Sequence, residues 1–189
     1  MAFGRPRKLF TEAELYDYAV GALARRMRSV AELKRLLRNR VEADTEIGKT
    51  LVELIVVRLK DLGYLNDAKY AAAFSSYRRE NEKFGRKRVV NDLRAKGVHG
   101  EVIEKAVSLV YDDVKEENLA RDYIRRKRLQ KPNDSDGDED KDKARKQAAR
   151  IFRQLMRAGF ESKTIFKIMK KWDVDEETLS ELENEASEA

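Results

Sequence analysis

Clusters of lysine and arginine are the residues of this sequence whose types and spacing suit a specific chemistry. They could bind phosphate or carboxylate groups. Of four such clusters, two carry predicted contacts, Arg86, Lys87 and Arg88 and then Arg150, Arg153 and Arg157. The members of the second cluster are three and then four residues apart, so in a helix they share one face. The first cluster follows a glycine at an expected helix start, where free backbone amides favour anions. Both clusters predict contact with a polyanion or an acidic partner.

The charge distribution supports the same partner class. The 189-residue chain has a net charge of +6. Residues 173–189 carry eight acidic and no basic side chains, which leaves 41 basic and 27 acidic residues in 1–172. The segment 132–142 holds six acidic residues and one lysine. A body this basic should attract a polyanion or an acidic protein face, although a solvated helix exterior is the alternative for any single cluster.

Other kinds of chemistry find little support. The chain has no cysteine and one histidine, which excludes disulfides, thiol catalysis and a Cys/His zinc site. The acidic run 134–140 fails the EF-hand pattern, because glycine stands at its fourth position and Arg145 at the twelfth. No glycine-rich phosphate loop or carboxylate pair stands out. We therefore expect no enzymatic activity, no metal site and no cofactor.

Membrane association is not expected either. The longest strongly apolar run, 54–57, is far too short to span a bilayer. The basic residues near the N-terminus are not followed by the apolar region of a secretory signal. We expect a cytoplasmic protein without membrane contacts.

The elements that would position the basic clusters show a threefold repetition. A tyrosine and an alanine recur as Tyr18-Ala19, as Tyr70-Ala71 and as Ala120 with Tyr123. Each copy continues with an apolar pair four residues apart on a basic helix, and these pairs are Leu33/Leu37, Val89/Leu93 and Ile151/Leu155. This spacing predicts a helical repeat of roughly 50 residues, in which each unit buries its apolar face on its neighbours.

The predicted fold is therefore all-α, an elongated tandem array of three three-helix repeats. Gly63, Gly97 and Gly159 should each end a helix. The predicted segments are a flexible basic arm at 1–11, repeats at 12–65, 66–113 and 114–172, an acidic disordered insertion at 132–142 and an acidic tail at 173–189. An array of this kind presents an extended surface to another macromolecule.

Two longer motifs resemble a known family. They are Gly63-Tyr64-Leu65-Asn66-Asp67-Ala68-Lys69-Tyr70-Ala71 and the stretch 84–98, which begins Phe84-Gly85-Arg86 and ends Lys96-Gly97-Val98. The capping pair Ser29 and Glu32, and the closing sequence Arg157-Ala158-Gly159-Phe160, match the flanking repeats. Over about residues 12–172 the sequence resembles the bacterial RecX regulatory proteins, modulators of the RecA recombinase.

This resemblance implies three tandem three-helix units that bind along the groove of the RecA–DNA filament. It also implies weaker filament growth, lower RecA ATPase activity and suppressed strand exchange, within recombination, DNA repair and the SOS response. The implied partners are the RecA filament and, through the basic faces, single- and double-stranded DNA. No small-molecule substrate is implied, and we expect a monomer.

On this basis two sets of site residues are predicted. Contacts to the partner or DNA are assigned to Arg86, Lys87, Arg88, Arg94, Arg150, Arg153 and Arg157. Structural roles in the family motifs are assigned to Gly63, Tyr64, Leu65, Asp67, Ala71, Gly85, Gly97, Gly159 and Phe160, with Tyr64 and Leu65 serving packing. The sequence departs from the family pattern at Val41, where glycine is common, at Arg86, where proline is common, and in the acidic insertion.

Two alternatives stay open. The first is an autonomous nucleic-acid-binding helical-repeat protein, whose affinity for DNA alone would be high and would fall steeply with salt. The second is a scaffold for some other acidic protein, which predicts weak DNA binding and no change in RecA turnover.

Overall fold

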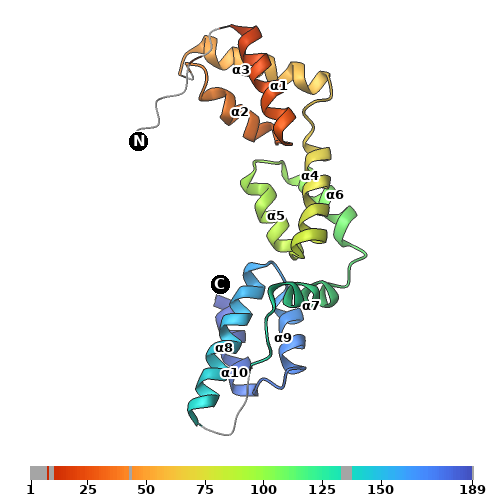
Figure 1. The fold of residues 1–189 in the computed structure, drawn as a ribbon, viewed down its shortest axis with the longest axis vertical. Helices are drawn as coiled ribbons and strands as arrows, with labels where there is room; N and C mark the ends of the chain where they lie inside the picture. The colour runs from red at the N-terminus through yellow and green to blue at the C-terminus, as the bar shows by residue number, and fades with distance from the viewer. Residues whose placement is uncertain (1–7, 9–10, 43, 133–137, 189) are drawn as a thin grey trace. The chain divides into compact units, whose positions relative to one another are not determined.

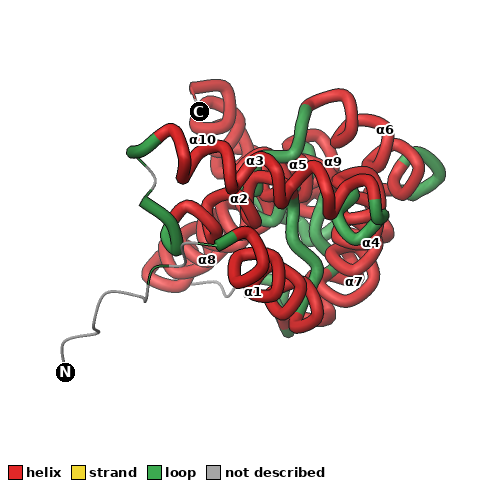
Figure 2. Tube along the Cα trace, turned by 90° about the horizontal axis from the view of Figure 1, so that it is seen from above, coloured by secondary structure: helices red, strands yellow, loops and turns green. Residues whose placement is uncertain are grey.

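The computed structural model of the chain describes residues 8, 11–42, 44–132 and 138–188. Throughout these ranges the secondary structure is helical, and no strand is found (Figure 1, Figure 2). The all-α prediction is confirmed. Most of the basic arm predicted at 1–11, and positions 133–137 of the predicted insertion, lie outside the described residues.

The helices, as far as the chain is described, are α1 (Glu12–Arg25), α2 (Val30–Arg38), α3 (Glu46–Asp61), α4 (Asp67–Tyr77), the π-helical turn η1 (Arg78–Glu82), α5 (Arg86–Ala95), α6 (Gly100–Tyr111), α7 (Glu116–Lys127), α8 (Asp138–Arg157), α9 (Ser162–Lys170) and α10 (Glu176–Glu188). None of these helices is long and apolar enough to cross a membrane.

The chain folds into two compact units. The first contains the described residues up to Ala73 together with Leu93–Ala106. The second contains Phe74–Asp92 and the described residues from Val107 onward. Helices α4, α5 and α6 therefore each contribute to both units. The repeat boundaries and the elongated form of the array stay predictions.

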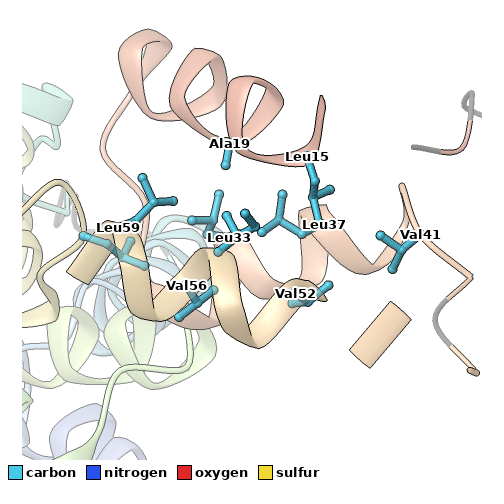
Figure 3. Close-up of a cluster of buried hydrophobic side chains, with 10 residues drawn as sticks. Leu15, Ala19, Leu33, Leu37, Val41, Val52, Val56 and Leu59 are labelled. Atoms are coloured by element: carbon cyan, nitrogen blue, oxygen red, sulfur yellow. The ribbon is translucent and has the colours of Figure 1, made fainter. Parts of the chain in front are cut away.

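The first unit is built around a core supplied by α1, α2 and α3. Leu15 and Ala19 of α1 meet Leu33 and Leu37 of α2, and Val52 lies on the facing side of α3 (Figure 3). Thr11, Ser29 and Thr45 cap the three helices, and Ser29 forms a complete capping box with Glu32. Because each cap satisfies an amide that the helix leaves unpaired, the helix starts follow directly from the sequence.

The second unit has its core between α7, α8 and α9. Tyr123 of α7 packs edge-on against Phe160, with ring centroids 5.7 Å apart, and Phe84 lies 6.1 Å from the same tyrosine ring. Phe152 of α8 stacks on Phe166 of α9.

The apolar pairs that recur in the sequence are all buried, as their spacing predicted. The exposed fraction is 0% to 4% for Leu33/Leu37, Val89/Leu93 and Ile151/Leu155.

Both acidic segments are largely helical where the structure describes them. Helix α8 already begins at Asp138, so the described part of the insertion from that residue onward is helical rather than disordered. An ion pair between Asp142 and Lys146, one turn apart, supports this start. The tail forms α10, whose first turn is capped because the Thr178 amide donates to Asp175 Oδ1 at 2.7 Å. Leu179 and Leu182 bury its apolar side, so this helix packs on the unit.

Candidate polyanion-binding surface

Helix α8 carries the predicted arginine stripe on its outer face. Its buried face is formed by Ala148, Ile151, Phe152 and Leu155. Arg150, Arg153 and Arg157 are exposed. The guanidinium groups of Arg150 and Arg157 form no ion pair with any described residue. Both guanidinium groups are therefore available to an external phosphate or carboxylate.

The cluster Arg86, Lys87 and Arg88 is exposed but already paired within the second unit. Arg86 binds Asp112 at 2.7 Å and Ser108 at 2.9 Å. Lys87 pairs with Glu161 at 3.1 Å, and Arg88 with Asp92 at 3.0 Å. Exposed pairs of this kind are weak, typically about 0–1 kcal/mol. An external anion must nevertheless compete with these carboxylates.

At the N-terminus of α5, two of the amides that the sequence analysis offered to an anion already have acceptors within the protein. The Gly85 amide donates to the Ala158 carbonyl at 2.8 Å, and the Lys87 amide donates to the Gly159 carbonyl at 3.3 Å. The C-terminal end of α8 therefore meets the N-terminal end of α5. The negative end of one helix dipole lies against the positive end of the other, so an external anion would have to compete with these two carbonyls.

Two glycines make this backbone junction possible. A Cβ on Gly85 would lie 2.3 Å from the Gly159 carbonyl oxygen. Gly159 has a φ of +90°, and its Cβ would lie 2.2 Å from the Arg88 backbone nitrogen. Since the obstacles are backbone atoms, no side-chain movement could relieve either overlap.

A second junction lies at the C-terminal end of α5, within the first unit. Ser29, which caps α2, donates its hydroxyl to the Lys96 carbonyl at 2.6 Å. Gly97 ends α5 with a φ of +72°, and a Cβ added to it would lie 2.4 Å from the Cβ of Ala31.

Arg94, predicted as a contact, is exposed in the first unit and has no ion pair with another described residue. The structure therefore places Arg94 in a different unit from the other six predicted contact residues.

Glu32 is the buried centre of this second junction, at 6% exposure. Its carboxylate accepts hydrogen bonds from the Tyr70 hydroxyl at 3.2 Å and from Lys96 Nζ at 3.0 Å, and it pairs with Arg26 at 3.6 Å. Burial alone would raise the pKa of Glu32, but the bonds from Lys96 and from the Ser29 amide outweigh it, so the pKa is lowered. Burial beside this carboxylate raises the pKa of Tyr70 to about 12. Glu32 is therefore held in its charged form.

The remaining motif residues occupy varied environments. Asp67 accepts the first amide of α2, from Val30, at 2.8 Å. Leu65, Ala71 and Phe160 are buried, and Gly63 adopts a φ of +73° at the end of α3. Tyr64, by contrast, is 63% exposed, so the packing role predicted for it is wrong. Its place beside the buried Leu65 had suggested packing, but the turn after Gly63 points only one of the two side chains inward.

The sequence analysis missed a third row of cations on α9. Lys163, Lys167 and Lys170 are exposed and form no ion pair within the described ranges. They line one side of a groove of about 560 Å³ between α9 and α10. Their spacing of four and three residues was the available signal, because it puts all three on one helix face. Among the residues described, no cluster of His, Cys, Asp and Glu could hold a metal ion.

The sequence is similar to several regulatory proteins. The family model described as "RecX, second three-helix domain" matches residues 66–107. "Regulatory protein RecX" from Myxococcus xanthus is 34% identical over 163 residues, which cover 82% of this chain and 83% of that protein. The protein of the same name from Mycolicibacterium vanbaalenii is 29% identical over 78% of this chain and 76% of its own.

The fold also has counterparts among solved structures. The crystal structure of RecX from Lactobacillus salivarius matches with a TM-score of 0.60, at 24% identity, and covers 86% of this chain and 96% of that chain. A second crystal structure, of a regulatory protein RecX, matches with the same TM-score of 0.60 at 23% identity. At these identities the two structures support the arrangement of helices only.

Proposed function

Because this chain belongs to the RecX family of regulatory proteins, we propose that it binds the groove of RecA–DNA filaments and lowers RecA ATPase activity, filament growth and strand exchange. It acts in the cytoplasm as a monomer, without catalysis or a cofactor of its own. Its partners are RecA protomers and the DNA that they hold.

The exposed arginine stripe of α8 is the observation that carries the proposal. Arg150 and Arg157 have no competing carboxylate among the described residues, whereas Arg86, Lys87 and Arg88 each have one. The backbone junction at Gly85 and Gly159 fixes α8 to α5, which holds the stripe in one orientation. Because the helix is already fixed, only the arginine side chains lose conformational entropy when the stripe meets a row of phosphates or acidic side chains.

Bridging explains how binding could become inhibition. A protein that contacts neighbouring protomers and the DNA backbone stabilises one state of the filament more than the others. Nucleotide turnover and strand exchange require the filament to move between states. Stabilising one of them therefore slows both processes.

RecA ATP hydrolysis on single-stranded DNA, measured as this protein is titrated in, tests the proposal. Inhibition should appear well below the concentration that coats the DNA, which a parallel titration on DNA alone at two salt concentrations defines. Inhibition only at DNA saturation would instead support an autonomous nucleic-acid-binding protein. No inhibition and weak DNA binding would support a scaffold for another acidic protein.

A stripe variant sharpens the test. Replacing Arg150, Arg153 and Arg157 by Gln should raise the half-inhibitory concentration at least about tenfold and lower the salt slope on single-stranded DNA by about 2. The charge-matched control replaces Lys60, Lys69 and Lys105, three exposed lysines of the first unit, by Gln. Equal losses in the two variants would show that net charge, not the stripe, governs binding.

A further inference from the structure

Helix α10 lies against two helices of the second unit, α8 and α9, whose exposed faces carry cations without an ion pair among the described residues. Helix α10 contains six glutamates and no lysine or arginine. In this unit it contacts α8 and α9, and the three run side by side (Figure 1). Leu179 and Leu182, 7% and 3% exposed, anchor it to the core. An acidic helix is thus held against two basic helices by a small apolar contact.

On the side of α8, one carboxylate of α10 contacts the basic face directly. Glu181 forms an ion pair with Arg145. Both residues line a groove of about 300 Å³ between α8 and α10, together with Lys146 and with Arg153 of the arginine stripe. The acidic helix therefore lies at the edge of the surface proposed to bind the partner.

On the side of α9, the contact is looser. The groove of about 560 Å³ has Lys163, Lys167 and Lys170 on one wall and Glu176 and Glu183 on the other. These lysines form no ion pair inside the described ranges, so they face the carboxylates across solvent. Carboxylates on the opposite wall of the groove still lower the local positive potential, because the field of a charge is felt over a Debye length of about 8–10 Å at physiological salt.

We propose that α10 is an internal competitor for a nucleic-acid backbone: it lies along the edge of the cationic surface of α8 and α9, and a phosphate backbone gains the whole surface by displacing it. Two rows of cations on adjacent helices suit a flexible strand that follows both. The apparent Kd for the nucleic acid equals the intrinsic Kd divided by the fraction of molecules in which α10 is displaced. The inference rests on the proposed function only in taking the basic faces of this unit as DNA contacts.

The test is the affinity of the full chain for a fluorescent oligothymidylate, measured by anisotropy at several salt concentrations. The variant Glu176→Gln, Glu181→Gln and Glu183→Gln keeps Leu179 and Leu182 and hence the anchor. It should bind about tenfold more tightly at low salt, a gain of about 1.4 kcal/mol.

The matched control is Asp17→Asn, Glu101→Gln and Glu104→Gln, which makes the same change in net charge at exposed positions of the first unit. The control should shift the affinity less than about twofold. An equal gain in both variants, or no gain in the α10 variant, would overturn the proposal.

Two further variants locate the effect. Truncation after Val174 should tighten binding more than the glutamine variant, with helicity and Trp172 fluorescence confirming that the rest stays folded. Adding Lys163→Gln, Lys167→Gln and Lys170→Gln to the glutamine variant should remove its gain; a gain that persisted in full would exclude α9 from the surface.

The RecA assay separates this proposal from the proposed function. If the wild type inhibits RecA but the α10 variant and its control bind DNA alike, only the competitor is wrong. If the α10 variant binds DNA more tightly but no form affects RecA, the proposed function fails and the competitor stands.

Discussion

The two junctions at the ends of α5 are built in opposite ways. At its N-terminal end, in the second unit, backbone meets backbone, and Gly85 and Gly159 leave no room for a Cβ. At its C-terminal end, in the first unit, side chains form the joint, chiefly the Ser29 hydroxyl and the Glu32 carboxylate. Both join one helix end to another of opposite dipole, but by different chemistry.

This difference predicts different tolerance to change. A backbone joint has a fixed separation, so an added methyl group must push whole helices apart. A side-chain joint can be adjusted by a compensating substitution or weakened by pH. Three glycines with positive φ, at 63, 97 and 159, allow the comparison to be made on one scale.

The largest effect is expected for Gly159→Ala. The new Cβ adopts a disfavoured φ of +90° and overlaps the Arg88 backbone at 2.2 Å. We expect a loss of about 3–4 kcal/mol in the free energy of unfolding, from strain and overlap together. Urea denaturation measures it, followed by circular dichroism, which reports both units, and by the fluorescence of Trp172, the only tryptophan and a residue of the same unit.

Gly63→Ala is the matched control for that variant. Gly63 has a similar positive φ of +73°, but nothing lies within 4 Å of its added Cβ. It should cost only the conformational strain, about 1 kcal/mol. If Gly159→Ala were no more destabilising than this control, the backbone joint would not be close-packed.

The next effect, Gly97→Ala, tests whether the side-chain joint can be repaired. Its Cβ would meet the Ala31 Cβ at 2.4 Å, a contact with a single methyl group. We expect a loss of about 2–3 kcal/mol. The double variant with Ala31→Gly removes the overlap and should recover to near the Gly63→Ala level, apart from about 1 kcal/mol for glycine within α2. Hydrogen exchange of the α2 amides is the measurement; a failure of Ala31→Gly to restore their protection would contradict the model of the joint.

The local parts of this fold could be predicted from the sequence, and the joints could not. The capping box of Ser29 and Glu32 and the helix end at Gly63 depend on residues a few positions apart, so their pattern is visible in the chain. The closure of the α5 N-terminus depends on Gly159, far along the sequence. A glycine that accommodates a distant backbone has the same sequence signature as one that ends a helix.

The candidate site was predictable to the same extent. Helical spacing placed Arg150, Arg153 and Arg157 on one exposed face, but spacing carries no information on ion pairs. Whether Arg86 is available depends on Asp112, which another helix brings to it. The anchoring of α10 was hidden because two leucines among many glutamates resemble a solvated tail, and only packing on α8 and α9 makes them core residues.

A smaller effect, dependent on pH, is expected for Glu32→Gln. The folded-state pKa of Glu32 is lowered below 4.5, so its contribution to stability is full above that value and is lost as pH falls through the folded pKa. At neutral pH the variant should lose about 2 kcal/mol, since the bonds from Lys96 and Tyr70 lose their charged acceptor.

Urea denaturation of both proteins at a series of pH values measures this dependence. The difference in stability between wild type and variant should shrink as the pH is lowered below 4.5. A difference independent of pH would show that Glu32 contributes through its shape and not through its charge.

The smallest expected difference, between Ser29→Ala and a control cap variant, separates the joint from an ordinary helix cap. The hydroxyl of Ser29 accepts a hydrogen bond from the Glu32 amide and donates one to the Lys96 carbonyl. A methyl group can form neither bond. Thr45→Ala is the control, because Thr45 caps α3 in the same unit but bonds otherwise only within its own loop. We expect about 1 kcal/mol for Thr45→Ala and about 1 kcal/mol more for Ser29→Ala, measured by urea denaturation. Equal losses would mean that the bond to Lys96 adds nothing, and that the joint rests on Glu32 and the fit of Gly97 against Ala31.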